Sequence, residues 1–279
     1  MTGTSRPSSS NEHPRHGDAM VDTHEDEYDD DIVALLELIW GEGFLAPGGA
    51  ENVRRTVAGL DLRDKILLDI GSGIGGVDLI LAGEFGARVI GFEIEQALIA
   101  RARDYASRSG LSERIEFRHV TPGPLQLDDA CVDVVFSSGA IIHIDNKLEL
   151  FKEVFRVLRP GGVFAAYDWL KGPDPYSDDM RYWFELEGLT YAMDTLENYE
   201  RMLAEAGFLD FQGSDDSTWY RRHAAEEYTR MKGELYEQVV ALLGEEKAAH
   251  FIENWRVIKI VLANGELRTC RFRARKPDL

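Results

Sequence analysis

Short apolar runs and amphipathic segments alternate along the chain from residue 65 to about residue 170. The apolar runs indicate buried parallel strands, because they are short, lack polar alternation and end in glycine or polar turns. These runs cover residues 65–70, 88–94, 114–120, 132–139 and 163–169, and helical spacing marks residues 77–86, 96–110 and 147–158. The order predicts an α/β fold with a doubly wound, mostly parallel sheet covered by helices on both faces.

The segments on either side of this core predict a helical cover. IVALLELIW follows an acidic stretch and has apolar residues at helical spacing, and residues 50–59 predict a second helix. Residues 172–195 are rich in proline and aromatic side chains, and we expect a substrate-covering insertion there. Residues 198–208 and 223–255 predict further helices.

The last apolar segment, VIKIVLANGELRTCRFRARK (257–276), is typical of a hairpin with Asn264-Gly265 as its turn. We interpret it as the sixth and seventh strands, separated from the first five by the helical cover. The complete prediction is a seven-stranded, Rossmann-like sheet.

The length of 279 residues suits one such domain with an appended cover. Residues 1–24 form a polar tail that we expect to be disordered, within which Met20 is a second candidate start. In the domain, 25–279, we expect an amino-terminal helical cover (25–60), a core (61–171), and the substrate cover with the last strands (172–279).

The charge of the chain argues against polyanionic partners. Fifty acidic and 31 basic residues give a formal net charge of −19, whereas nucleic-acid and anionic-membrane surfaces attract basic proteins. The tail lacks the apolar core of a secretory signal, and no run of about 18 apolar residues predicts a membrane span. Cys131 and Cys270 lack metal-ligand spacing. We therefore expect a cytoplasmic protein that acts on a small molecule, without a metal.

The strongest motif is LDIGSGIGG (68–76), which follows a predicted strand and opens a predicted helix. Its glycines allow tight turns and close approach of a ligand to the backbone, and the helix start offers free N–H groups. Asp69 precedes the first glycine, and Glu93 ends the next strand, where an acid can accept ribose hydroxyl groups. These features fit a dinucleotide as well as S-adenosylmethionine (SAM).

The stretch VLRPGGVF (157–164) resembles a motif of the class I SAM-dependent methyltransferases, and its distance from the glycine loop matches that class. The resemblance implies SAM as the cofactor. The cofactor-binding positions that it implies are Asp69, Gly71, Ser72, Gly73, Gly75, Glu93, Ile94, Thr121 and Ser138.

Two further stretches, LIWGEGFLAPGG (38–49) and SSGAIIHI (137–144), resemble the phosphoethanolamine N-methyltransferases. The likeness covers residues 25–200 well and the last 80 residues loosely. Carried over position by position, the catalytic Tyr–His pair of that family falls on Tyr28 and His143.

The departures from the family concern the acceptor. Gly139 stands at the position of an acid, Trp169 and Glu185 replace two tyrosines, and only Tyr191 remains of the groups that bind phosphate. We interpret the remaining aromatic and charged residues as a site for a zwitterionic amino acid. Its residues are Trp40, Trp169, Arg181, Tyr182, Tyr191 and Asp194.

That set is similar in outline to the bacterial methionine S-methyltransferases, which make S-methylmethionine toward dimethylsulfoniopropionate. The thioether of methionine is therefore our first expectation for the acceptor. Phosphoethanolamine or another small amine is the alternative within the enzyme class. A SAM-binding sensor without transfer activity is the alternative outside it.

Overall fold

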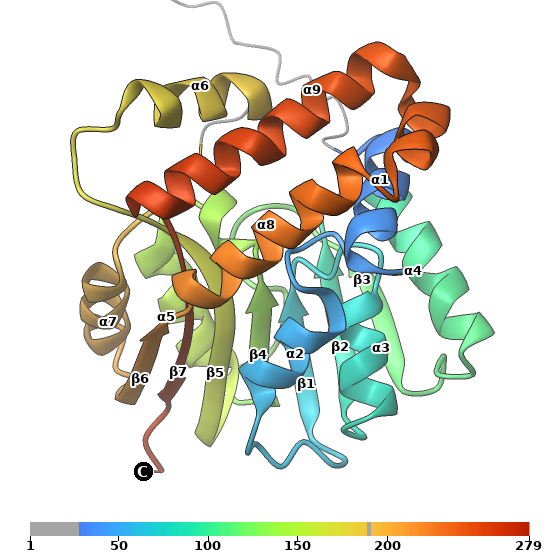
Figure 1. Ribbon diagram of the computed structural model, residues 1–279. Coiled ribbons are helices and arrows are strands. Elements are labelled where there is room, and N and C mark those ends of the chain that lie inside the picture. The colour runs from blue at the N-terminus through green and yellow to red at the C-terminus, as the bar shows by residue number, and fades with distance from the viewer. Residues whose placement is uncertain (1–27, 189–190, 279) are drawn as a thin grey trace, which may run out of the picture.

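The computed structural model describes residues 28–188 and 191–278. In this part of the chain seven strands form one sheet in the order β3-β2-β1-β4-β5-β7-β6, with β7 antiparallel to both neighbours (Figure 1). The strands are β1 Ile66–Ile70, β2 Arg88–Glu93, β3 Ile115–His119, β4 Val132–Ser138, β5 Leu158–Lys171, β6 Leu209–Asp215 and β7 Leu267–Arg275. The predicted doubly wound, mostly parallel sheet is confirmed.

Helices cover both faces of the sheet. One face packs against α2 Gly49–Val57, α3 Gly76–Gly83 and α4 Gln96–Arg108, and the other against α5 Lys147–Val157 and α7 Leu196–Glu205. Neighbouring residues of a strand point to opposite faces, so Leu67 belongs to the first apolar layer and Leu68 to the second. This two-sided burial explains why the central strands are apolar at nearly every position.

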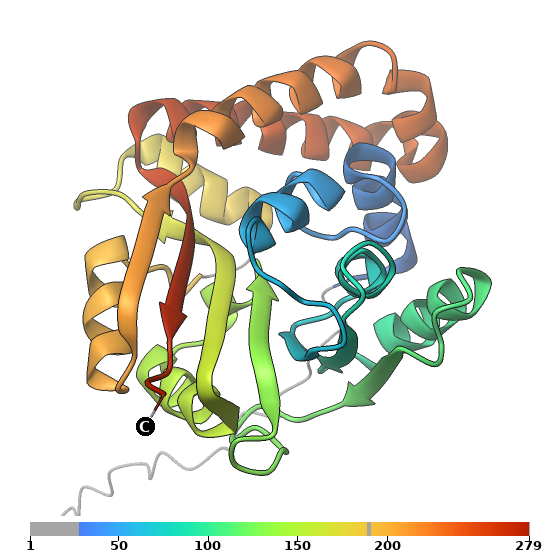
Figure 2. The same ribbon diagram turned by 90° about the horizontal axis from the view of Figure 1, so that it is seen from below.

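A helical cover lies across the carboxyl edge of the parallel strands, as Figures 1 and 2 show. It consists of α1 Asp30–Trp40, α6 Asp178–Glu187, α8 Ser217–Lys232 and α9 Tyr236–Asn264, with the short 3-10 helix η1 Ile141–His143 beneath it. One apolar cluster joins α6, α8 and α9 to the sheet through Tyr167 and Leu267. A second cluster joins α1 to α8 and α9. The cover is thus packed on the edge where ligands of such sheets bind.

The predicted hairpin at 257–276 is wrong. Residues 257–264 are the last turns of α9, which ends at Gly265 with a left-handed φ of 75°. The buried positions of these turns follow helical and not strand spacing: Val257, Ile258, Val261 and Leu262. The sixth strand is instead β6, an edge strand between α7 and α8 whose residues are mostly exposed.

Strand β5 begins five residues before the predicted start at Val163. Leu158 already pairs with Val132, and the next pair is Val163 with Val134, so the four residues between form a bulge. Gly161 within the bulge has a φ of 74°, which suits glycine. The predicted break at 159–162 is therefore an irregularity inside the strand.

No helix of the described residues is long and apolar enough to cross a membrane. The predicted tail, 1–24, with Met20, lies outside the described residues. The predicted subdivision of 25–279 stays a prediction.

Candidate functional site

The glycine-rich loop joins β1 to α3 at the carboxyl edge of the sheet. Gly71, Gly73 and Gly75 have φ values of 78°, 53° and 87°, in the left-handed region that favours glycine. A Cβ on Gly71 would lie 2.4 Å from the Cβ of Ala140 in the loop after β4. The loop therefore depends on glycine both for its turns and for its close contact with the neighbouring loop.

The loop after α1 rests directly on this glycine loop. The N–H of Gly76 donates to the carbonyl oxygen of Gly43 at 2.9 Å. A Cβ on Gly76 would lie 2.3 Å from that same oxygen. The backbones of the two loops are thus in direct contact, and the GEGF stretch (41–44) brings the amino-terminal helix to the candidate cofactor site.

Glu93 lies at the end of β2 and its side chain turns back to the glycine loop. Its carboxylate accepts hydrogen bonds from the N–H groups of Gly73 at 2.8 Å, Ile94 at 2.7 Å and Glu95 at 3.0 Å. The residue is 7% exposed. The carboxylate is therefore held at the edge of the loop, at the position expected for an acceptor of ribose hydroxyl groups.

Asp69 and Asp78 form a buried acidic pair beneath the loop. Both residues are 0% exposed, and neither carboxylate has a hydrogen-bond partner in the described chain. Burial raises the pKa of Asp69, and the nearby Glu93 raises it further. Burial, Asp69 and Glu93 likewise raise the pKa of Asp78. The hydroxyl of Ser72 is also buried without a partner, so the loop covers a small polar interior with unused hydrogen-bonding capacity.

The remaining predicted cofactor positions follow strand ends at the same edge. Ile94 comes directly after β2 and is 54% exposed, Thr121 follows β3 and is exposed, and Ser138 is the half-buried last residue of β4. Parallel strands bring these ends to one side of the sheet. All the positions predicted for the cofactor are thus placed along one edge.

The two predicted catalytic residues come from the segment just before α1 and from η1. Tyr28, just before α1, packs against the apolar cluster that contains Ile74 of the glycine loop and Leu98 of α4. His143 ends η1, and its ring lies 5.4 Å from that of Tyr191 in an edge-on contact. His143 reaches solvent, yet burial lowers its pKa, and the charge of Lys147 adds to this. The pairing of Tyr28 with His143 stays a prediction.

Two of the six predicted acceptor residues, Trp169 and Tyr191, lie together. Their ring centroids are 6.0 Å apart, and Tyr191 stacks on Trp183 of α6 at 5.4 Å. Trp40 packs against Trp255 of α9, with ring centroids 6.0 Å apart, and its indole N–H donates to Glu227 at 2.9 Å. The aromatic wall of the site is therefore formed mainly by the end of β5, α6 and the segment that begins at Tyr191.

The other three predicted acceptor residues have partners elsewhere. Arg181 donates to Asp178 at 2.7 Å on the exposed side of α6, and its side chain is 57% exposed. Tyr182 is 39% exposed. Asp194 accepts from the N–H of Thr195 at 2.8 Å and so belongs to the start of α7. A carboxylate-binding role for Arg181 has no support in this arrangement.

Sequence reasoning missed the acids and amides that face this aromatic wall. Glu187, at the end of α6, accepts hydrogen bonds from Tyr191 at 2.7 Å and from Asn254 of α9 at 2.7 Å. Glu227 of α8 is 5% exposed and accepts the indole N–H groups of Trp40 and Trp255. Burial raises the pKa of Glu227. The spacing of Trp183, Glu187 and Tyr191, four residues apart in turn, is the one local signal of this group.

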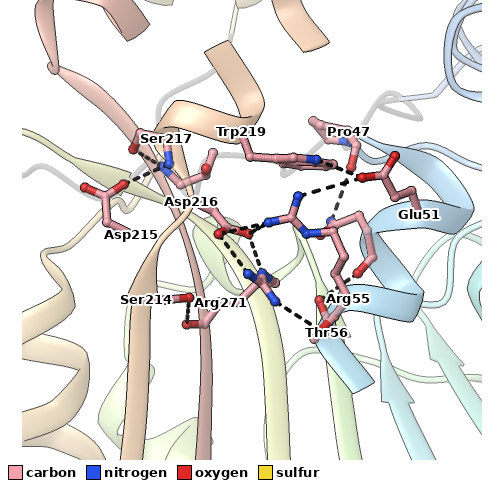
Figure 3. Close-up of polar contacts among 12 residues, drawn as sticks. Pro47, Glu51, Arg55, Thr56, Ser214, Asp215, Asp216, Ser217, Trp219 and Arg271 are labelled. Carbon is pink, nitrogen blue, oxygen red and sulfur yellow. Dashed lines mark hydrogen bonds and ion pairs between the residues drawn. The ribbon is translucent and has the colours of Figure 1, made fainter. Parts of the chain in front are cut away.

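A buried ion cluster fixes the root of α8 to the core (Figure 3). Asp216 accepts from Arg271 of β7 at 2.9 Å and from Arg55 of α2 at 3.2 Å. The Arg55 guanidinium lies 4.3 Å above the ring of Trp219, whose N–H donates to Glu51 at 3.0 Å. We call Asp216, Arg55 and Arg271 the Asp216 cluster. It ties the amino-terminal cover, the last strand and the helix that carries Glu227 to one another.

No group of three or more His, Cys, Asp or Glu side chains in the described residues is arranged to hold a metal ion. Two surface hollows are present at the opposite, amino-terminal edge of the parallel strands, lined for example by Leu60 and Val163. Neither hollow is lined by a residue of the glycine loop or by Trp169, Trp183 or Tyr191, although Phe211 lines one of them. The glycine loop, Glu93 and the aromatic side chains make the carboxyl edge the candidate site.

Comparison with known families agrees with this placement. A family model described as a methyltransferase domain matches residues 68–166, from the end of β1 into β5. Residues 68–166 form a methyltransferase domain, and they lie in a sheet with the Rossmann-like fold of class I methyltransferases. This confirms the class predicted from the glycine loop and the VLRPGG stretch, and SAM is the cofactor of that class.

Relatives of the methyltransferase domain lie in the branch that the sequence resembles. Phosphoethanolamine N-methyltransferase 3 of Arabidopsis thaliana is 28% identical over 90% of this chain and 50% of its own length. The chain spans about half the length of the first curated relatives it matches.

Two solved structures show the same fold as the methyltransferase domain. Haemonchus contortus phosphoethanolamine N-methyltransferase 2, in complex with phosphomonomethylethanolamine and S-adenosylhomocysteine, superposes with a TM-score of 0.84 at 24% identity, over 91% of this chain and 59% of that one. A putative sarcosine dimethylglycine methyltransferase from Galdieria sulphuraria gives 0.77 at 20% identity, over 90% and 98%.

Proposed function

We propose that the chain transfers the methyl group of SAM to a small zwitterionic acceptor, and that the thioether of methionine is its first acceptor. The observation that carries the proposal is the wall formed by Trp169, Tyr191 and Glu187 beside His143. Aromatic faces and a carboxylate favour a cationic group and disfavour a phosphate dianion. Phosphoethanolamine, whose methyltransferases are the relatives named above, is the second candidate.

The residues of the glycine loop fit SAM. Asp69 and Ser72 have buried oxygen atoms without partners, and Glu93 is held at the position for ribose hydroxyls. Gly71 and Gly73 leave room for close approach to the backbone. Ile94, Thr121 and Ser138 are placed at the adjoining strand ends, and we assign them to the adenosine moiety, with Gly75 shaping the loop.

The chain itself has little chemistry to supply in this reaction. When bound, SAM supplies an electrophilic methyl group on a sulfonium, so transfer to a thioether exchanges one sulfonium for another without moving a proton. We assign Tyr28 and His143 to closing the site and orienting the acceptor. The lowered pKa of His143 keeps its imidazole neutral near pH 7, so it adds no positive charge that would repel a developing sulfonium.

The test is transfer from labelled SAM to methionine, phosphoethanolamine, ethanolamine and glycine. Turnover on methionine supports the proposal, and turnover on phosphoethanolamine alone refutes the acceptor while keeping the enzyme class. A SAM-binding sensor would bind SAM with no turnover on any of them. His143→Ala separates the cases, since we expect it to reduce kcat at least tenfold and leave the SAM dissociation constant within about threefold of wild type.

A further inference from the structure

The Glu187 carboxylate is held by neutral donors alone. One oxygen accepts from the indole N–H of Trp183 at 3.2 Å and from the amide of Asn254 at 2.7 Å, and the other accepts from the hydroxyl of Tyr191 at 2.7 Å. No Lys, Arg or His in the described chain forms an ion pair with it. Glu187 is therefore fixed in place, and within residues 28–188 and 191–278 no ion pair neutralises its charge.

A second buried atom beside Glu187 needs a hydrogen-bond donor. Asn254 is 3% exposed, and its Oδ1 has no partner in the described structure. The orientation of its amide is fixed, because its Nδ2 donates to Glu187, so Oδ1 can only accept. A buried acceptor without a donor costs about 1–3 kcal/mol. A ligand with N–H groups would meet this need.

The surrounding rings also suit a cation. Trp183 is 0% exposed, and its ring lies 5.5 Å from Trp169 and 5.4 Å from Tyr191. Tyr220 of α8 is fully buried with an unpartnered hydroxyl, on which both Glu187 and Glu227 act electrostatically. Trp183, Tyr191, Tyr220, Glu187 and the Oδ1 of Asn254 thus form an aromatic and acidic group between these helices. The nearest basic side chains between the helices bond elsewhere: His250 to the carbonyl of Leu186, and Lys259 over the ring of Tyr228.

We propose that Glu187 and the Oδ1 of Asn254 bind a protonated primary amine of the acceptor. This inference rests on the proposed function and narrows it. Aromatic faces alone would hold a quaternary ammonium, whereas these two oxygen atoms require N–H donors. An amine held there has no free lone pair and is not the nucleophile. The methyl group then goes to another atom of the same molecule, which for methionine is the thioether sulfur.

The experiment compares two ligands on two proteins. Methionine and its des-amino analogue γ-methylthiobutyrate are titrated into wild type and Glu187→Gln with S-adenosylhomocysteine present, and KM is measured for both with SAM. Removing the amine should weaken binding to wild type about 10- to 100-fold, the loss expected for a charged hydrogen-bonded pair. Glu187→Gln should weaken the binding of methionine by a similar factor and change the binding of the analogue little.

Two further variants keep the interpretation clear. Asp179→Asn changes an exposed acid in the first turn of the same helix and should leave both ligands unaffected. Asn254→Ala removes the unpartnered Oδ1 and should weaken methionine binding about 3- to 10-fold, again through the amine. The SAM dissociation constant and the melting temperature show whether each variant is folded.

If removing the amine from methionine weakens binding to wild type and to Glu187→Gln by the same factor, this inference is overturned, and methionine is still the acceptor. Turnover on phosphoethanolamine and none on methionine overturns both the acceptor and the inference, because the only amine of that compound is the nucleophile. Failure of wild type to bind methionine overturns both as well.

Discussion

The Asp216 cluster gives a prediction for the coupling between the cover and the core. Asn at position 216 keeps the size of the side chain and removes its charge, which leaves two guanidinium groups facing a neutral amide. The Asp216 side chain is 7% exposed, and those of Arg55 and Arg271 are 27% and 26% exposed. The cluster is therefore buried on the acid side and partly hydrated on the arginine side.

The expected cost follows from these exposures. Removing one partner of a fully buried ion pair costs about 3–5 kcal/mol. Water can reach both arginines of the cluster, and an Asn oxygen can still accept one hydrogen bond, so we expect about 2–3 kcal/mol for Asp216→Asn. In a chain of this length each kcal/mol lowers the melting temperature by about 2–4 °C, which gives a decrease of roughly 4–12 °C.

The assay is thermal unfolding of wild type, Asp216→Asn and a control. Glu84→Gln is the control because Glu84 also pairs with an arginine of α2, Arg54, through two hydrogen bonds of 2.7 and 2.6 Å. That pair lies in solvent, and surface pairs contribute at most about 1 kcal/mol. The control should therefore melt within about 4 °C of wild type.

The cluster also has an expected effect on function. Asp216 begins α8, with its carbonyl accepting the N–H of Tyr220 at 3.0 Å, and α8 continues to Glu227. A displaced root of α8 should raise KM for the acceptor and leave SAM binding unchanged, since no hydrogen bond or ion pair of the described residues joins the cluster to the glycine loop. A melting temperature equal to wild type, or a loss confined to SAM affinity, would refute this reasoning.

Two more predictions concern the core beneath the site. Gly71→Ala adds a Cβ 2.4 Å from that of Ala140 at a left-handed φ, so it should destabilise the fold by about 2 kcal/mol or more and weaken SAM binding in calorimetry; an unchanged SAM affinity would contradict the assigned loop. Burial raises the pKa of Asp168 to about 6, so the folded state holds a proton that the unfolded state releases near pH 4, and stability decreases as pH rises between these values. Asp168→Asn should remove this pH dependence. In urea unfolding, its free energy of unfolding should therefore rise relative to that of wild type as the pH increases from 4 to 7, and parallel pH profiles of the two proteins would disprove the reasoning.

The sequence predicted the central strands because each is buried on both faces. The edge of the sheet lacked such a signal. β6 has the sequence LDFQGSD, in which most residues are exposed, so it shows neither an apolar run nor a clean alternation. The β-branched residues of 257–262 favoured a strand by composition, although their buried positions fall in pairs four residues apart. Periodicity was the more reliable guide there than residue type.

The cofactor side was predictable for a similar reason. Its residues lie in short stretches after strands, and a parallel sheet brings all strand ends to one edge. The acceptor side depends on how α6 and α9 pack against each other. Glu187 and Asn254 are 67 residues apart, and no local pattern indicates that one donates to the other. Arg181 has the right chemistry for a carboxylate, but the helix turns it to solvent.

The acidic side chains of the cover fall into two groups that differ in their partners. We interpret Asp216 as structural, and Glu187 and Glu227 as available to a ligand. Asp216 receives two guanidinium groups, so its charge is neutralised within the protein, and a ligand has nothing left to neutralise. Glu187 and Glu227 receive only indole, amide and phenol donors, which orient a carboxylate without cancelling its charge. Uncompensated charge in a half-buried site lowers stability until a cation arrives. We therefore expect a bound ammonium ligand to raise the melting temperature of wild type, and Glu187→Gln to remove most of that increase.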